Sequence, residues 1–232
     1  MLSESFLFLS FLSLLQIVLA VPSPQTTPVP IMPDPLPFGE GTNFKLVAQV
    51  QHGDFKPSIK NWELSSYHVA PCLDYAVLSK PGKGRTFYAN GTATELQSKQ
   101  GDLLSDGNTP PTPYGFIIPK QNETEDGRRP VSINCGAGTP GVGVTFPPIK
   151  QPQVAQLSYS VGSFFACNKT LPYGPAIALY FSTMSVRPKG CAQIKLFPEC
   201  VHDGEVHAFA NSVSCYHNVT AIDWLPYIYD GL

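Results

Sequence analysis

Hydrophobic and polar residues alternate with a period of two along much of the chain after residue 42. In NFKLVAQV, residues 43–50, the side chains of Phe44, Leu46, Ala48 and Val50 fall on one face of an extended strand. The alternation recurs at 131–135, 154–162 and 192–197, with inner-face positions Val131, Ile133, Cys135, Ala155, Leu157, Tyr159, Val161, Ala192, Ile194 and Leu196. A period of two indicates strands with one buried face.

The run AIALYF at 176–181 is apolar on both faces, which predicts a central strand. Short apolar runs at 75–80, 85–90, 115–120 and 141–146 bring the set to about ten short strands. Clusters of glycine and proline separate the runs. This pattern predicts an all-β fold, namely a single antiparallel β-sandwich or barrel-like domain.

One segment carries a helix start signal. In TATELQSKQGDLLSDG, residues 92–107, Thr92 is followed three positions later by Glu95, which is the spacing of a capping box. The segment has no clean apolar stripe of helical period, so a polar loop is the alternative.

The first twenty residues form an apolar run from Phe6 to Ala20, with small residues at Val18 and Ala20. This pattern predicts a signal peptide over 1–20 and a secreted, extracellular protein. A membrane anchor is the alternative, but the run is short for a bilayer. No other stretch is long and apolar enough to span a membrane, so the mature chain is expected to have no membrane span.

The remaining chain divides into three predicted parts. Seven prolines between residues 21 and 38 predict an extended linker over 21–41, because proline fixes φ and lacks an N–H donor. A β domain follows over 42–200. Residues 201–232 form a C-terminal extension, which Cys215 would tie to the domain.

Cysteines and sequons support an extracellular location. The chain has six cysteines: Cys72, Cys135, Cys167, Cys191, Cys200 and Cys215. An even number in an oxidising compartment predicts three disulfides, with the pairing left open. Four Asn-x-Thr sequons predict N-glycans at surface positions: Asn90, Asn122, Asn168 and Asn218. The formal net charge is −2 without a basic run, which argues against nucleic acid as a partner.

The stretch NWELSSYHVAPCLDY, residues 61–75, gathers side chains that build nucleophilic sites: Ser66, His68, Cys72 and Asp74. Ser66 and His68 are two residues apart on a predicted strand, and sharing a face is not a catalytic geometry. Cys72 follows the end of that strand, where it can join a disulfide. We interpret the stretch as a strand, a turn and half of a disulfide, with no catalytic residue.

Other chemistry is possible at three further sets of residues. His202 and His207, with Asp203 and Glu205 between them, are weak candidates for a metal site, and an exposed polar loop is the commoner structure. We therefore predict no metal and no other cofactor. Glycoside hydrolysis needs two convergent carboxylates, and the candidates are Asp54, Glu63, Asp74, Glu95, Asp102 and Asp106. Carbohydrate binding needs exposed aromatic rings, and the candidates are Trp62, Tyr67, Tyr88, Tyr114 and Trp224.

The segments FKLVAQV, LSSYH, YAVL and FYANGT, between residues 44 and 92, resemble a family of small secreted fungal proteins. In that family an F-x-L-x-A strand is followed by Ser-Tyr-His, AVL and F-Y-x-N-G-T strands. The family is known only as a domain of unknown function. The resemblance implies a secreted, mostly β protein and transfers no catalytic residue.

These observations favour a secreted, N-glycosylated, disulfide-stabilised β-protein with a binding or cell-surface role, and not an enzyme. Carbohydrate recognition is the favoured form of that role. The expected partners are an extracellular carbohydrate, a cell-wall component or a host protein. The alternative is a secreted hydrolase that uses a carboxylate pair or a His/Asp metal site.

Overall fold

A computed structural model describes residues 36–107, 111–146, 154–184 and 186–228 of the chain. Strands make up 51% of it and helices 7%, which confirms the prediction of an all-β fold. The elements are β1 (Gly39–Gly41), β2 (Asn43–His52), β3 (Glu63–Ala70), β4 (Leu73–Ser79), β5 (Phe87–Asn90), α1 (Ala93–Gln97), β6 (Asp102–Gly107), β7 (Thr112–Ile117), β8 (Arg129–Pro130), β9 (Ser132–Cys135), β10 (Gly143–Thr145), β11 (Gln156–Ser158), β12 (Ser163–Leu171), β13 (Gly174–Ser182), β14 (Cys191–Val201), β15 (Ala210–Asn211), β16 (Val213–Cys215), the 3-10 helix η1 (Val219–Ala221) and α2 (Leu225–Ile228).

The predicted signal peptide, residues 1–20, lies outside the described residues, as does the predicted linker up to residue 35. The end of that linker segment is not a free arm, because β1 pairs with β16. The described part also has more strands than the ten predicted. Two of them, β8 and β15, are only two residues long.

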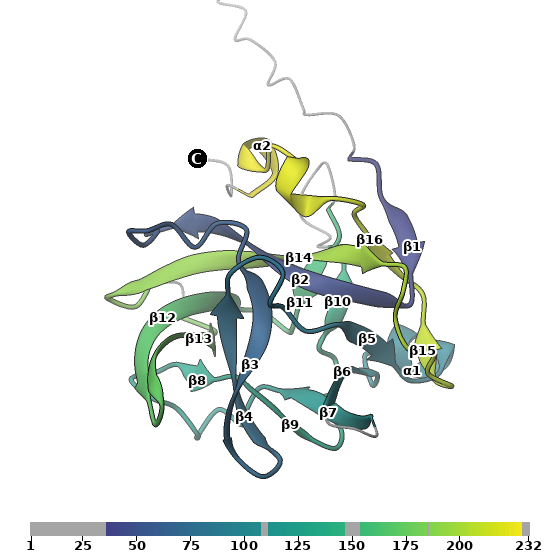
Figure 1. Ribbon diagram of the computed structural model, residues 1–232, viewed down its shortest axis with the longest axis horizontal. Helices are drawn as coiled ribbons and strands as arrows, with labels where there is room; N and C mark the ends of the chain where they lie inside the picture. The colour runs from purple at the N-terminus through teal and green to yellow at the C-terminus, as the bar shows by residue number, and fades with distance from the viewer. Residues whose placement is uncertain (1–35, 108–110, 147–153, 185, 229–232) are drawn as a thin grey trace, which may run out of the picture. The chain divides into compact units, whose positions relative to one another are not determined.

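Twelve strands form one antiparallel sheet, in the order β15-β5-β6-β7-β9-β4-β3-β2-β14-β12-β13-β8. Two further pairings, β5 with β2 and β4 with β13, join strands that are distant in this order. The sheet therefore curls back on itself, as the ribbon view shows (Figure 1). Two ribbons, β1–β16 and β10–β11, lie outside this sheet. The barrel-like architecture is the one that the strand pattern predicted.

The strand β2 separates the two largest hydrophobic clusters. Its alternating residues Phe44, Leu46 and Ala48 are fully buried in the main core, as the period of two predicted. Val47 points the other way and is also buried, in a second cluster that includes Phe197. Both faces of the strand are thus buried, whereas its sequence pattern predicted that only one face would be buried.

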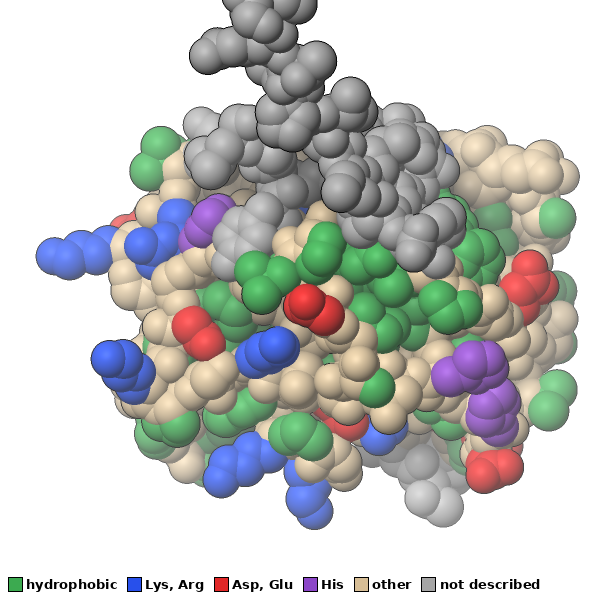
Figure 2. Space-filling view, turned by 90° about the horizontal axis from the view of Figure 1, so that it is seen from above, with side chains coloured by type: hydrophobic (Ala, Val, Ile, Leu, Met, Phe, Trp, Pro, Cys, Tyr) green, Lys and Arg blue, Asp and Glu red, His purple; other side chains and the backbone are tan. Residues whose placement is uncertain are grey.

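The C-terminal segment supplies the cover of this second cluster. The Trp224 ring stacks on Phe197 with ring centroids 3.7 Å apart, and its Nε1 donates to the Val219 carbonyl at 2.8 Å. A disulfide between Cys200 and Cys215 holds β16 to β14. Viewed from the side of α2, hydrophobic side chains gather on this face (Figure 2). Residues 201–228 are therefore packed onto the sheet.

The strand expected over 154–162 is interrupted. The strand β11 ends at Ser158, and β12 begins only at Ser163. Between them Ser160 has a left-handed backbone, with φ of 46°, and Val161 is 85% exposed. A Cβ at Gly162 would lie 2.3 Å from the Phe181 ring, so the chain approaches the core too closely for a side chain. The alternation therefore did not predict this turn.

The helix start at Thr92 is present, but the helix is short. Thr92 and Glu95 form both hydrogen bonds of a capping box at the start of α1. The helix ends before Lys99, whose φ of 58° is left-handed. Residues 102–107 then form β6, in which Leu103 is fully buried. Leu103 and its neighbour Leu104 are both buried in the sheet, and this burial explains why the second half of the segment is a strand.

Candidate functional site

The stretch 61–75 forms a hairpin of β3 and β4, and its polar residues gather at one end of the sheet. His68 lies directly opposite Asp74 in the strand register. Asp74 Oδ1 is 2.9 Å from His68 Nδ1, and the Asp74 side chain is 6% exposed against 64% for His68. Asp74 is therefore a buried carboxylate that holds an exposed imidazole.

Arg85, from the loop before β5, completes this group. Its Nη1 donates to Ser66 Oγ at 2.8 Å, its Nε donates to Ser105 Oγ at 2.9 Å, and its Nη1 lies 3.6 Å from Asp74 Oδ2. Burial lowers the pKa of Arg85, and the charge of Asp74 opposes that shift. The guanidinium stays a cation at neutral pH and cannot accept a proton.

Ser66 therefore accepts a hydrogen bond from a cation, an arrangement that does not activate its hydroxyl as a nucleophile. Cys72 is not a nucleophile either. It occupies the turn between β3 and β4, with φ of 64°, and forms a disulfide with Cys135. The other two disulfides are Cys167–Cys191 and Cys200–Cys215. The interpretation of the stretch as a strand, a turn and half of a disulfide agrees with this geometry.

The two candidate metal ligands lie in different surroundings. His207 lines a cleft of about 740 Å³, where it stacks on Tyr88 with ring centroids 3.7 Å apart. Its Nε2 is 3.0 Å from Asp106 Oδ2. Burial, followed by the charges of Asp106 and Asp102, raises the pKa of Tyr88 to about 12. His202 instead faces His217. Within the described residues, no group of three or more His, Cys, Asp or Glu side chains can hold a metal ion.

The six carboxylates considered for glycoside hydrolysis all have local partners. Asp54 and Glu95 accept hydrogen bonds within their own turns. Glu63 and Asp102 each accept one from a backbone amide, at 2.6 Å in both cases. Asp74 and Asp106 each contact a histidine. Each of the six carboxylates therefore has a partner within the protein.

Most of the candidate aromatic rings for sugar binding are buried. Tyr88, Tyr114 and Trp224 are 5%, 4% and 1% exposed, which corrects their proposed role. Their apolar area packs in the core, as is usual for aromatic residues of a β domain. Trp62 is half-buried against the main core. Tyr67 is the remaining candidate, and the structure gives it a partner that the sequence did not indicate.

That partner is Tyr173, at the tip of the β12–β13 hairpin, where its side chain is 77% exposed. The two rings stack with centroids 6.2 Å apart and an angle of 23° between their planes. The Tyr173 backbone N–H donates to the Tyr67 hydroxyl at 2.7 Å, which fixes the hairpin tip. Tyr75 lies opposite Tyr67 in the register, and Lys169 Nζ is 4.9 Å from the Tyr75 ring centre. We call Tyr67, Tyr75, Tyr173 and Lys169 the tyrosine face.

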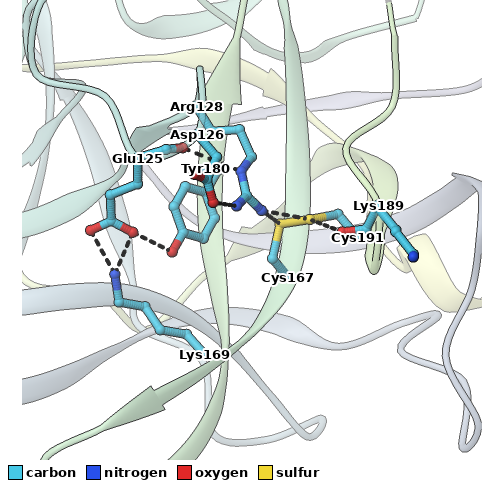
Figure 3. Close-up of polar contacts among 8 residues, drawn as sticks. All are labelled: Glu125, Asp126, Arg128, Cys167, Lys169, Tyr180, Lys189 and Cys191. Atoms are coloured by element: carbon cyan, nitrogen blue, oxygen red, sulfur yellow. Dashed lines mark hydrogen bonds and ion pairs between the residues drawn. A yellow bond between two sulfur atoms is a disulfide. The ribbon is translucent and has the colours of Figure 1, made fainter.

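A polar network holds Lys169 in place (Figure 3). Both Glu125 carboxylate oxygens accept from Lys169 Nζ, at 2.8 and 2.6 Å, and the Tyr180 hydroxyl donates to Glu125 at 2.9 Å. Burial acts to raise the pKa of Glu125, but the hydrogen bonds from Lys169 and Tyr180 outweigh it and hold that pKa below its ordinary value. The Lys169 charge is therefore neutralised beside the exposed rings.

Arg128 extends this network to a disulfide. Its Nη1 lies 3.3 Å from Cys167 Sγ and 3.0 Å from Cys191 Sγ, while its Nη2 pairs with Asp126 at 3.2 Å (Figure 3). The guanidinium also lies over the Tyr180 ring, 4.9 Å from its centre. The network thus anchors the edge of the tyrosine face to β12 and β14.

The sequence analysis missed Arg85, Glu125, Lys169 and Tyr173. Each meets its partners across long stretches of chain, and none belongs to a motif with a fixed spacing. Of these four residues, only Tyr173 could have been found from the sequence, because the segment LPYGP at 171–175 is typical of a turn. A turn between two apolar strands places its middle residue at a hairpin tip.

The four sequons differ in exposure. Asn122, Asn168 and Asn218 are exposed. Asn90 is half-buried, and its Nδ2 donates to Asp102 Oδ1 at 2.8 Å. Glycosylation takes place at that nitrogen, so the surroundings of Asn90 suit it least. No helix among the residues that the structure describes is long and apolar enough to cross a membrane.

Comparison with known proteins identifies the family of the chain. The antigenic protein SchS34 of the fungus Stachybotrys chartarum is 34% identical over 212 residues, which cover 79% of this chain and 90% of that protein. No solved structure matches significantly. A family model described as "Domain of unknown function (DUF7907)" matches residues 41–200, which include the whole tyrosine face. The resemblance found in the sequence is therefore confirmed, and the chain belongs to this family, DUF7907.

Proposed function

We propose that this protein is a secreted, N-glycosylated binding protein that recognises an extracellular carbohydrate through the tyrosine face, and that it is not an enzyme. The observation that carries the proposal is the exposed Tyr173 ring, held in a fixed position against Tyr67. An exposed aromatic ring on a rigid hairpin has no evident role in the core. It is a typical feature of binding surfaces, where tyrosine offers a large contact area at little loss of side-chain entropy.

The chemistry of the tyrosine face suits a neutral sugar. The faces of a sugar ring expose C–H groups that pack on aromatic rings, while its hydroxyl groups need hydrogen-bond partners at the edge. The Glu125 carboxylate, whose side chain is 44% exposed, keeps acceptor capacity there, and Lys169 neutralises its charge. Asp126 likewise balances Arg128. A surface without net charge favours a polyhydroxylated, uncharged ligand over a charged one.

Several observations support an extracellular location. The three disulfides form and persist in oxidising compartments. The relative from Stachybotrys chartarum is named as an antigenic protein, which is consistent with an extracellular one. We expect glycans at Asn122, Asn168 and Asn218, and little or none at Asn90. Intact-mass and glycopeptide analysis of protein secreted from a eukaryotic host checks this, and an unglycosylated product would refute it.

The binding proposal predicts that Tyr173→Ala lowers carbohydrate affinity without lowering stability. Removing a central aromatic contact weakens binding by at least about tenfold, the equivalent of about 1.4 kcal/mol. The ring is mostly in solvent, so the melting temperature should stay within about 1 °C of wild type. The measurement is an array of extracellular oligosaccharides, including β-glucan, chitin and mannan fragments, followed by titration of the best ligand.

Phe209→Ala is the matched control, because Phe209 is 67% exposed but lies outside the tyrosine face. It should bind as wild type does. If no oligosaccharide binds, the carbohydrate proposal is wrong. If a ligand binds equally well to wild type and to Tyr173→Ala, the site lies elsewhere.

A further inference from the structure

A groove of about 1360 Å³ lies between the β10–β11 ribbon and the main sheet, and it shares no residue with the tyrosine face. One wall is the ribbon with the turn at 159–162, and the other includes α1 residues, β14 and β16. The segment that follows α1 is held there, since Gly141 N donates to the Gly101 carbonyl at 2.8 Å. The volume exceeds the range of about 300–1,000 Å³ that is usual for small-molecule pockets.

The inner surface of the groove is apolar. Val142, Leu157, Phe164 and Ile194 line it and belong to the buried main core. Half-buried side chains on the ribbon side, Val144, Phe146 and Tyr159, continue this surface towards solvent. Val161 at the rim is 85% exposed. A groove that runs from a hydrophobic core to exposed apolar side chains suits a ligand with a hydrocarbon portion.

Hydroxyl groups also line the groove, but several of them are engaged within the protein. The hydroxyls of Thr145 and Ser158 bind one another at 2.5 Å. Ser163 Oγ accepts from Gln193 at 3.4 Å, and Ser212 Oγ donates to Glu40 at 3.3 Å. A polyhydroxylated ligand would have to displace these contacts, whereas a hydrocarbon chain would not.

Lys99 is the charged group of the groove that is placed to meet a ligand. The charged residues among the described ones that line it are Lys99 and Lys195. Lys195 has a partner within the protein, and the nearby Glu40 carboxylate is held by Ser212. Lys99 is exposed and follows α1 in a left-handed backbone conformation. The ligand complementary to this lining is an anion.

We propose that this groove binds an amphipathic anion of the alkyl carboxylate class, with the hydrocarbon chain along the apolar inner surface and the carboxylate near Lys99. This goes beyond carbohydrate recognition at the tyrosine face and does not depend on it. The apolar lining supplies affinity for the chain, and Lys99 selects the sign of the head group.

The test uses the glycosylated, secreted protein and two probes of equal chain length, decanoate and decyltrimethylammonium, in calorimetric titrations below their micelle concentrations. Decanoate should bind with one-to-one stoichiometry, at least about tenfold more tightly than the cation. Lys99→Glu should weaken decanoate binding at least about threefold, because it reverses a charge at the rim. Lys83→Glu, an exposed lysine outside the groove, is the control and should change nothing.

A second variant tests the hydrocarbon site. Gly143 lines the groove, and a Cβ there meets no atom within 4 Å, so this position has room to start a larger side chain and Gly143→Phe is the variant chosen to obstruct the groove. It should weaken decanoate at least about tenfold at an unchanged melting temperature. The proposal is overturned if decanoate does not bind, if the cation binds as well, or if neither groove variant affects binding. Displacement of decanoate by an oligosaccharide would assign the groove to sugars and overturn it too.

Discussion

At the scale of single residues, Arg85 joins three strands at one end of the barrel-like sheet. Its guanidinium contacts Ser66 in β3, Asp74 in β4 and Ser105 in β6. A planar guanidinium offers five donors in fixed directions, so one side chain can serve all of these groups. The same contacts give Ser66 a structural role, because its hydroxyl accepts a hydrogen bond from the buried cation.

We predict that Arg85→Leu destabilises the protein by about 3–5 kcal/mol, because it leaves the carboxylate of Asp74 buried without its cation. Arg85→Lys should recover only part of the loss, since an ammonium group cannot reproduce the fork of contacts. Urea unfolding at pH 7 measures both.

Ser66→Ala and His68→Ala are the controls for this prediction. Each removes one partner at the same end of the sheet, and each should cost only about 1 kcal/mol. The His68 side chain is 64% exposed, so little packing is lost with it. An Arg85→Leu protein with the unfolding midpoint of wild type would mean that the charge does not hold this end together.

Residue contacts of this kind mark the limit of prediction from the sequence. Ser66, His68 and Asp74 were recognised as neighbours because they are close along the chain. Arg85 comes from a different loop, and the Tyr173–Tyr67 contact spans 106 residues. Hydrophobic alternation is a local property, so it predicted β2 and β14 as strands but not what covers β2 or which rings meet at the surface.

At the scale of secondary-structure elements, the disulfides connect strands that also pair or lie close together. Cys72–Cys135 joins the β3–β4 turn to the end of β9 across 63 residues of sequence. Cys200–Cys215 joins β14 to β16 across only 15 residues. In the chain-entropy view, a cross-link stabilises by restricting the unfolded chain, and more so when it closes a longer loop.

We predict that Cys72→Ser costs about 4 kcal/mol of stability and Cys200→Ser about 3 kcal/mol, from the loop lengths that the two bonds close. Each variant should expose one alkylatable thiol under denaturing, non-reducing conditions, because the partner cysteine is left unpaired. Thiol counting and urea unfolding are the measurements. Equal stability of Cys72→Ser and wild type, or a free thiol in the wild type, would contradict the structural role of Cys72.

At the scale of the whole molecule, ionisable groups set how stability depends on pH. Burial acts to raise the pKa of Glu63, but hydrogen bonds from the backbone of Gly82 and Gly84 and the charge of Lys45 outweigh it and lower that pKa below 4.5. Glu125 is shifted in the same direction. Burial raises the pKa of Tyr88 and of Tyr216 from 10.0 to about 12. Acidic and basic pH should therefore both destabilise the fold.

The sign of each effect follows from proton linkage. A carboxyl whose pKa is lower in the folded state contributes stability above its unfolded pKa of 4.5 and loses it as the pH falls through the folded pKa. A tyrosine whose pKa is raised contributes stability below 10.0 and loses it as the pH rises towards about 12.

We therefore predict a melting temperature that is nearly constant from about pH 5 to about pH 9 and falls on both sides. Glu63→Gln should lower the plateau and flatten the acidic side, because it removes a carboxylate that is 6% exposed and paired with Lys45. Tyr216→Phe should flatten the basic side and cost about 1 kcal/mol on the plateau, since the Tyr216 hydroxyl accepts from the Ala155 amide.

Glu123→Gln and Tyr173→Phe, both at exposed positions, are the matched controls and should leave the profile unchanged. Circular dichroism melts between pH 3 and pH 11 give the profile. A melting temperature that rises below pH 4, or a basic side unaffected by Tyr216→Phe, would show that these buried groups do not govern the pH dependence of the fold.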